Sequence, residues 1–291
     1  SIMATLRDIR RRIRSVQSTQ KITRAMKLVA AAKLRRAQER ILEARPYATK
    51  MSDLLANLAL RVGSEQHPLL ARRAARQRQL VIITADKGLC GAFNSNILRA
   101  SLEFIRQSPQ SAVTLVVVGR KARDHYRRRG FTIKSEMVGF FDHLAYAHAQ
   151  ELSTGLIASY AEGEADEVQL IYNEFRSVAV QRVVRAQLLP IEPGEGGVGA
   201  LTVDYLYEPS PDTLLAALLP KHVTTQVYRA LMESLAGEYG ARMTAMDAAT
   251  KNAQEMVELL TIQYNKARQE RITKELLDIV GGAEALRQAG E

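Results

Sequence analysis

The sequence predicts an α/β protein with long helices, in which the two chain ends form an antiparallel coiled coil around a separate central α/β domain. From Ala4 to Arg45 and from Ala241 to Val280 the chain runs for 42 and 40 residues without Gly or Pro. The mean globular helix has only about 11–12 residues. Between these stretches, short β-branched runs alternate with helical patterns. Each terminal stretch would span about 60 Å, too long for the interior of a compact domain.

The N-terminal stretch carries an apolar stripe at the 3-4 spacing with which one helix packs along another. The stripe comprises Leu6, Ile9, Ile13 and Val16, and it resumes at Ala30, Leu34, Ala37, Ile41 and Ala44. Three polar residues interrupt it: Gln20, Thr23 and Lys27. The apolar residues of this region lie one position to the side: Ile22, Met26 and Val29. We therefore expect the seam to shift or to change partner midway.

The C-terminal stretch carries a matching stripe of Met246, Ala249, Ala253, Met256 and Leu260. Small Ala and unbranched Met predict a narrow, adaptable interface rather than a rigid zipper. Two independent surface helices on a large core are the alternative interpretation. Because each stripe needs a partner of its own length, an antiparallel coiled coil is favoured.

The middle of the chain predicts a Rossmann-like α/β domain with a largely parallel sheet, because strands and helices alternate. Strands are expected at Gln79–Thr84, Val113–Val118 and Thr132–Val138, helices at Asn94–Ile105, Lys121–Arg129 and Leu144–Tyr160, and a closing hairpin at Val168–Phe175 with Val178–Leu189. Gly194 to Gly197 mark a loop, Asp212 is the expected N-cap of the next helix, and Pro220 allows a fresh helix start. The expected domains are residues 1–62, 63–208 and 209–291.

The net charge of +10 is concentrated at the N-terminus, since residues 1–50 hold 14 Lys/Arg against 3 Asp/Glu and the remainder holds 27 against 28. A basic helix invites a nucleic-acid or membrane interpretation. Tyr47 is the only aromatic residue of this region, so bases have no stacking platform and a membrane has no aromatic anchor. A solvated face and a surface that meets acidic protein loops both remain open.

Composition excludes several further classes of protein. The longest apolar run, Leu214 to Leu219, is far shorter than a membrane span. With Cys90 alone, neither an intrachain disulfide nor a Cys-based metal cage can form, which favours a reducing compartment. No signal or transit segment is expected before Met3, and Met3 is the expected natural start, which leaves the origin of Ser1-Ile2 open.

The turn from Thr84 to Asn94 follows the first strand, where a ligand would be expected in an α/β sheet. It contains Gly88 and Gly91 but neither the Lys-Ser/Thr of a phosphate loop nor a dinucleotide fingerprint. Cys90 lacks an evident His or carboxylate partner, so a packed structural thiol is favoured over a nucleophile. His143 and His148 are five residues apart, which does not suit a metal pair on one helix face. We predict no catalytic residue, no cofactor and no metal.

Four segments nevertheless resemble one family. They are Thr19–Lys33 (TQKITRAMKLVAAAK), Asp86–Gly91 (DKGLCG), Tyr264–Gln269 (YNKARQ) and Ile272–Ala285 (ITKELLDIVGGAEA). Together they resemble the γ subunit of F-type ATP synthase, of bacterial type. The last segment is the most specific, because it fits the family signature through Ile272, Thr273, Glu275, Asp278, Gly282 and Ala283.

The resemblance implies the central rotor stalk of a proton-translocating ATP synthase. Such a subunit turns inside the ring of three α and three β subunits and couples proton flow to ATP synthesis or hydrolysis at sites on β. Its other partners are the ε subunit and the c-ring, and its membrane association is indirect, through the Fo sector. The expected location is the cytoplasmic face of the bacterial inner membrane, with the mitochondrial matrix side as the alternative. The single cysteine rules out the dithiol switch of the plastid form.

The resemblance also assigns contacts with β. Met26 and Lys27 match one contact region of the family, and Arg268, Gln269 and Thr273 match an upper region that catches a β loop. Two other functions stay open at this point. A basic helical nucleic-acid-binding protein would show steeply salt-dependent DNA affinity, and a Rossmann-like enzyme with helical extensions would bind nucleotide on its own.

Overall fold

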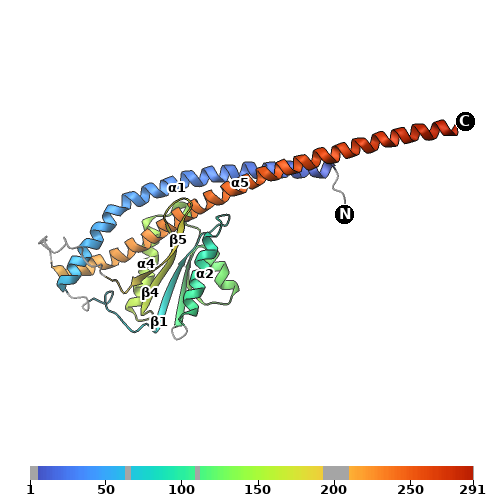
Figure 1. Cartoon of the computed structure of the whole chain (residues 1–291). Coiled ribbons are helices and arrows are strands. Elements are labelled where there is room, and N and C mark those ends of the chain that lie inside the picture. Colours follow the sequence, from blue (N-terminus) through green and yellow to red (C-terminus); the bar gives the residue numbers. More distant parts are fainter. Residues whose placement is uncertain (1–5, 63–66, 109–111, 193–209, 291) are drawn as a thin grey trace. The chain divides into compact units, whose positions relative to one another are not determined.

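The structure is a computed structural model that describes residues 6–62, 67–108, 112–192 and 210–290. It divides into two compact units, residues 1–29 with 245–291 and residues 30–244. Helix α1 (Leu6–Val62) and helix α5 (Pro211–Ala289) each contribute to both units (Figure 1). The loop expected at Gly194 to Gly197 lies outside the described residues. No helix in the described ranges is both long enough and apolar enough to cross a membrane.

The unit of residues 30–244 contains a five-stranded sheet in the order β3-β2-β1-β4-β5. Its strands are β1 (Gln77–Ile83), β2 (Ala112–Val118), β3 (Ile133–Met137), β4 (Glu167–Phe175) and β5 (Gln181–Leu189). The first four strands are mutually parallel, and β5 pairs antiparallel with β4. The predicted largely parallel sheet with a closing hairpin is confirmed.

Helices cover both faces of this sheet, as a parallel sheet with apolar strands requires. Helices α2 (Phe93–Arg106) and α3 (Arg120–Arg128) lie on one face, over Leu80 and Ile82 of β1. On the other face, Val81 and Ile83 pack with α4 (Tyr146–Ala161) and with parts of α1 and α5. A short 3-10 helix, η1 (Phe141–His143), precedes α4. Alternate residues of β1 thus serve two separate cores.

Both long helices run through an internal proline. α1 continues past Pro46 to Val62, and α5 begins at Pro211 and contains Pro220 without a break. The fresh helix start at Pro220 is therefore wrong. Leu219 and Val223 are 1% and 0% exposed, so packing on both sides of the proline outweighs the lost backbone hydrogen bond.

The N-cap of α5 is Ser210 rather than Asp212. The Ser210 Oγ accepts a hydrogen bond from the backbone N–H of Thr213 at 3.3 Å, and it also contacts the Thr213 hydroxyl at 2.9 Å. Asp212 instead lies in the first turn, where a carboxylate is favoured by the helix dipole.

Two glycines allow α5 to approach the sheet closely. A Cβ on Gly237 would lie 3.3 Å from a ring carbon of Phe93, and a Cβ on Gly240 would lie 3.2 Å from a ring carbon of Phe175. A side chain at either position would require its neighbours to shift by a few tenths of an ångström.

An ion cluster ties α1 to the sheet. Lys33 of α1 and Lys87 of the turn after β1 each donate to a different carboxylate oxygen of Asp142 in η1, both at 2.9 Å. The hydrogen bonds from Lys33 and Lys87, of which that from Lys33 has the larger effect, lower the pKa of Asp142 to about 2. One carboxylate thereby joins three elements that are distant in sequence.

Asp142→Asn should lower the free energy of unfolding at neutral pH by about 1 kcal/mol, because these ion pairs are half exposed and screened. A carboxyl whose folded-state pKa lies below its unfolded value stabilises the fold above that unfolded value. The difference from wild type should therefore shrink as the pH falls below about 4 towards 2. Urea unfolding of the full chain between pH 7 and pH 3 measures this. Asp53→Asn is the control, and an equal pH dependence in both variants would contradict the assignment.

Gly119→Ala should destabilise the residues 30–244 unit by about 3 kcal/mol or more. Gly119 has φ of 93°, and a Cβ there would lie 2.2 Å from the carbonyl oxygen of Thr84. Gly155→Ala within α4 is the matched control, because its Cβ meets nothing within 4 Å. The control should gain about 0.5–1 kcal/mol from helix propensity. Thermal and urea unfolding compare the two, and equal stabilities would refute the clash.

Candidate functional site

The paired helices of the residues 1–29 and 245–291 unit keep one seam along their whole shared length. Leu6, Ile9, Ile13 and Val16 are buried or half-buried, and the same spacing continues through Gln20, Thr23 and Lys27, of which Thr23 is only 7% exposed. The expected sideways shift is wrong. Ile22 and Val29, which were to carry the shifted seam, are 57% and 56% exposed, and Met26 is half-buried.

Polar pairs across the seam explain why it does not shift. The hydroxyls of Thr23 and Thr250 share a hydrogen bond at 2.7 Å. Lys27 Nζ donates to Asp247 Oδ1 at 2.6 Å, and Lys251 contacts the other oxygen of Asp247 at 3.1 Å. The hydrogen bonds from Lys27 and Lys251, of which that from Lys27 has the larger effect, lower the pKa of Asp247. Two of the three polar seam residues of α1, Thr23 and Lys27, therefore have partners on α5, so that the register needs no apolar replacement there.

On α5 the seam is formed by Met246, Ala253, Val257 and Leu260 rather than by Met256, which is 48% exposed. The spacing of a supercoiled pair requires one four-residue step between 253 and 257, and Val257 satisfies it. Near the start of α1, Arg10 donates to the hydroxyl of Tyr264 at 2.6 Å, and its guanidinium lies 5.4 Å from the Tyr264 ring centroid. Asp247, Thr250 and Val257 are the functional seam residues that pattern reasoning missed. Asp247 and Thr250 could have been found by matching the polar residues along one helix with polar residues along the other.

The N-terminal helix presents an apolar strip beside this polar seam. The strip consists of Ile22 and Val29, which are 57% and 56% exposed on one face of the helix, and Leu28, on a different face, is 63% exposed. Basic side chains such as Lys21 and Arg24 lie exposed around them. Large aliphatic side chains in such numbers on a solvated helix face indicate a surface that another molecule covers.

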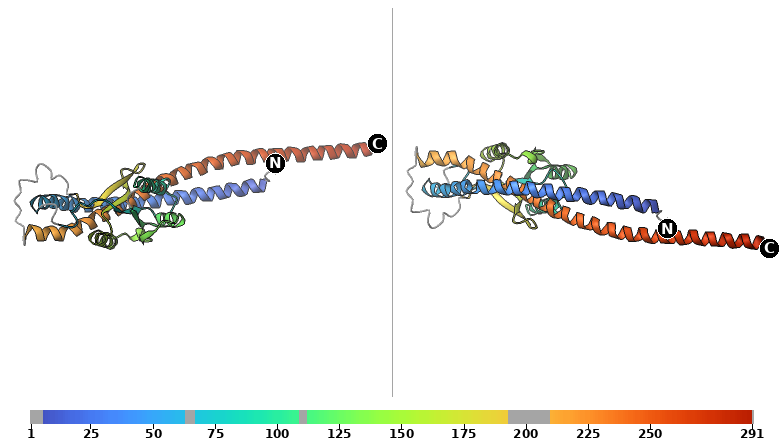
Figure 2. Two further views of the ribbon diagram at one scale, coloured as in Figure 1. Left: turned by 90° about the horizontal axis from the view of Figure 1, so that it is seen from below. Right: turned by 90° about the horizontal axis from the view of Figure 1, so that it is seen from above.

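The last part of α5 has no partner within the described residues. All side chains from Arg268 to Gly290 are exposed, because α5 continues beyond the first residues of α1 (Figures 1 and 2). The exposed aliphatic residues of this segment are Ile272, Leu276, Leu277, Ile279, Val280 and Leu286. Arg271 and Glu275 form an i,i+4 ion pair at 2.8 Å. A glycine inside a helix costs about 1 kcal/mol relative to Ala, so Gly281 and Gly282 make this isolated helix depend on an external partner.

The residues expected to contact β fall into two separate places. Met26 and Lys27 lie at the polar part of the seam, and Lys27 is already paired with Asp247. Arg268, Gln269 and Thr273 lie on the exposed segment of α5, together with the signature residues Ile272, Glu275, Asp278, Gly282 and Ala283. The first group is partly buried within the chain, whereas the second is entirely free for contact with another molecule.

The polar groups of the turn after β1 form hydrogen bonds within the chain rather than with a ligand. Both oxygens of Asp86 accept backbone N–H bonds at 2.9 Å, one from Arg120 and one from Gly139. Asn94 accepts from the N–H of Ala85 and donates to the carbonyl of Lys87. These bonds close the turn on itself, and Leu89 with φ of 61° and Gly91 with φ of 57° make the tight reversal.

Cys90 is a packed structural thiol. It is 1% exposed, and burial raises its pKa, with the charge of Glu238 adding to the effect. Asn94 donates to its sulfur at 3.3 Å. A thiol held in its neutral form inside the core is a poor nucleophile.

A buried ion pair fastens this turn to α5. Arg242 and Glu238, whose side chains are 11% and 8% exposed, lie 2.6 Å apart, and Arg242 also donates to the carbonyl oxygen of Gly88 at 3.0 Å. Burial raises the pKa of Glu238, while the Arg242 guanidinium opposes the shift. Among the described residues, no group of His, Cys, Asp and Glu could hold a metal ion.

Known proteins are similar to this chain along almost its whole length. The sequence model of the family described as ATP synthase matches residues 5–286. The ATP synthase gamma chain of Pelotomaculum thermopropionicum is 49% identical over 285 residues, which cover 98% of this chain and 100% of the relative. The gamma chain of Anaeromyxobacter sp. (strain K) is 50% identical over 290 residues with the same coverage.

Solved structures show the same fold. The central stalk and c-ring structure of the Tetrahymena thermophila mitochondrial ATP synthase contains a chain with 28% identity and a TM-score of 0.60, covering 78% of this chain and 99% of that one. A chain of the Euglena gracilis mitochondrial ATP synthase has a TM-score of 0.70 at 21% identity, over 98% of this chain and 96% of that one. With half of the residues identical over the full length of its bacterial relatives, the chain belongs to the ATP synthase gamma chain family.

Proposed function

We propose that the chain is the central rotor stalk subunit of a proton-translocating F-type ATP synthase. It couples proton flow through the membrane sector to ATP synthesis or hydrolysis by turning within a ring of three α and three β subunits. The observation that carries this proposal is the full-length similarity to gamma chains. The exposed aliphatic end of α5 supports it, because that segment needs an apolar partner surface, and none of the described residues of this chain covers it.

The coupling is mechanical in this proposal. A rotor can bias each β subunit among its nucleotide-affinity states only if it contacts those states differently. The residues 1–29 and 245–291 unit is asymmetric in this sense, since it combines basic residues, an exposed apolar strip and polar seam pairs. The subunit itself contributes no catalytic residue and no cofactor, and ATP is processed on β.

The remaining partners follow from the same proposal. The central α/β domain packs beside the ε subunit and above the c-ring, and the chain reaches the membrane only through the Fo sector. The complex lies on the cytoplasmic face of a bacterial inner membrane, since the bacterial gamma chains share about half of their residues with this chain. Neither nucleic acid nor nucleotide is a partner of this subunit.

The contacts with β are proposed to involve Met26, Lys27, Arg268, Gln269 and Thr273. Arg268, Gln269 and Thr273 act directly, because their side chains are exposed on α5. Lys27 acts mainly through its bond to Asp247, which holds the register beside Met26 and the exposed strip. Its side chain is still 36% exposed, so an acidic β loop can also reach it.

Reconstitution tests the proposal as a whole. The purified chain is mixed with α and β subunits, and the assembly is isolated by size exclusion. A stable assembly with ATP-driven rotation supports the proposal, and the isolated chain should hydrolyse no ATP. If α and β form a complex from which this chain is missing, or if the isolated chain binds DNA with a steep dependence on salt, the alternative of a basic nucleic-acid-binding protein is favoured.

Lys27→Glu should lower ATP-driven proton pumping several-fold, because it places two carboxylates together in the seam at Asp247. The swapped variant Lys27→Glu with Asp247→Lys should recover most of the coupling, since it restores an opposite-charge pair. Pumping is measured in membrane vesicles and compared with ATP hydrolysis. Unchanged coupling in the single variant would remove Lys27 from the mechanism, and failure of the swap would assign its effect to direct contact with β.

Arg268→Ala with Gln269→Ala should lower coupling by about tenfold while leaving the stability of the isolated chain within about 0.5 kcal/mol of wild type. The reason is that both side chains are exposed in the chain alone. Lys266→Ala is the control, an exposed residue of α5 outside the assigned set. Pumping in vesicles and urea unfolding give the two readouts. Equal losses of coupling in the variant and the control would contradict the assignment.

A further inference from the structure

A wide groove lies in the residues 30–244 unit, between α1, α4 and α5. Its volume is about 1000 Å³, and it is lined by residues 41–53 of α1, 146–157 of α4 and 220–233 of α5. This size lies at the upper end of the range for small-molecule sites. The seam, the turn after β1 and the exposed end of α5 all lie elsewhere in the chain, so none of the features discussed above accounts for the groove.

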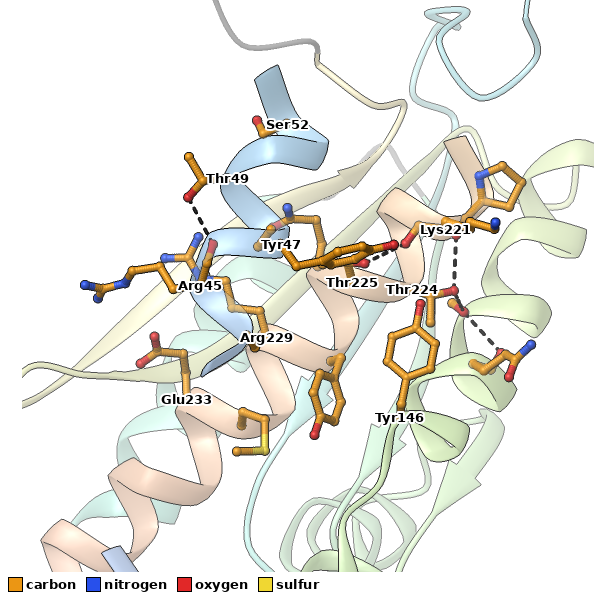
Figure 3. Close-up of a pocket in the computed structure, with 18 of the residues that line it drawn as sticks. Arg45, Tyr47, Thr49, Ser52, Tyr146, Lys221, Thr224, Thr225, Arg229 and Glu233 are labelled. Atoms are coloured by element: carbon orange, nitrogen blue, oxygen red, sulfur yellow. Dashed lines mark hydrogen bonds between the residues drawn. The ribbon is translucent and has the colours of Figure 1, made fainter. Parts of the chain in front are cut away.

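Unpaired cations lie along the groove. The guanidinium groups of Arg45 and Arg229 form no hydrogen bond or ion pair with any of the described residues, and both side chains are exposed. Lys221 lies further along the same groove (Figure 3). Two carboxylates, Asp53 and Glu233, also line it. The lining therefore carries three basic groups against two acidic groups.

Glu233 does not neutralise the arginines. Its Oε2 accepts a hydrogen bond from the backbone N–H of Phe175 at 3.1 Å, and the residue is only 8% exposed. Neither guanidinium lies within 4.0 Å of it, although both favour its ionised form. Burial is the larger influence and raises the pKa of Glu233. The carboxylate is thus directed towards the sheet, and the arginines keep donors for an anion from outside.

The remaining wall is apolar in character. Tyr47 and Tyr146 are 55% and 41% exposed, and Tyr146 packs edge-to-face on Tyr228 with ring centroids 5.5 Å apart. Ile157, Pro220 and Met232 add aliphatic surface to the lining.

The hydroxyls of Thr224 and Thr225 on this wall already form hydrogen bonds within the chain. Thr224 bonds to the hydroxyl of Ser153 at 2.7 Å and to the Pro220 carbonyl at 3.1 Å, and Thr225 donates to the Lys221 carbonyl at 2.8 Å (Figure 3). Threonines with satisfied hydroxyls offer mainly their methyl groups to a ligand.

We propose that this groove binds a small amphipathic anion. Its carboxylate, sulfonate or phosphate head pairs with Arg45 and Arg229, whose planar donors suit such groups. Its aromatic or alkyl body lies against Tyr47, Tyr146 and the aliphatic lining. A metal ion is disfavoured by the excess of positive charge, and a purely polar anion would leave the aromatic wall uncovered. The proposal is independent of the rotor function.

Titration of the full chain with 1-anilinonaphthalene-8-sulfonate tests the proposal, because this probe combines a sulfonate with an aromatic body. We expect one saturable site by fluorescence and calorimetry, and we expect laurate to compete for it. Arg45→Gln with Arg229→Gln should weaken binding at least tenfold, since charge-assisted bonds to the head group are lost. Arg36→Gln with Arg182→Gln removes the same charge from exposed positions outside the groove and should leave affinity within twofold.

A second variant keeps the test decisive if the double arginine variant does not fold. Ala48→Phe fills part of the groove from α1 without a change in charge, and it should also weaken the probe at least tenfold. Far-ultraviolet circular dichroism confirms that each variant is folded. Non-saturable binding, equal losses in the two arginine pairs, or full affinity in Ala48→Phe would each overturn the proposal.

Discussion

The packing of the first part of α5 against the sheet and α1 is the interaction on which the residues 30–244 unit depends. Leu215, Leu219, Val223, Val227 and Leu231 are each at most 1% exposed. They occupy one core with β1, β4 and α4, so this part of α5 is a structural spine rather than an added surface helix. Burial of this kind contributes about 1.5–3 kcal/mol for each large aliphatic side chain. It explains why the helix passes through Pro220, Gly237 and Gly240 unbroken.

The residues 1–29 and 245–291 unit is held together differently. Its seam combines modest apolar residues with two polar pairs, Thr23 with Thr250 and Lys27 with Asp247. Exposed ion pairs contribute little to stability, but polar groups in a helix seam can fix register at some cost in stability. This is consistent with a shaft whose register matters more than its independent stability. The apolar strip beside the seam is left for a partner.

Within the residues 30–244 unit, polar contacts as well as the core join α1 and α5 to the sheet. Arg242 of α5 bonds to Gly88, and Lys33 of α1 is joined to Lys87 through Asp142. Both connections end at the turn after β1, where the sequence pattern suggested a ligand site. In this unit, that turn forms polar contacts with both α1 and α5.

The sequence by itself determined the two long helices, the α/β alternation, the parallel sheet with its hairpin and the family. These features follow from local composition, from the spacing of apolar residues and from motifs that are contiguous in the sequence. It also placed the segment with Arg268, Gln269 and Thr273 correctly on an uninterrupted helix.

Only the tertiary structure decided where the seam runs and which residues pair across it. From the sequence, Gln20, Thr23 and Lys27 looked like a break, because a polar residue in an apolar stripe carries no sign of its partner some 220 residues away. The same limit applies to Val257, to the unbroken helix at Pro220 and to the groove between α1, α4 and α5. Each depends on contacts between segments distant in sequence, and the energy of those contacts overrides local preference.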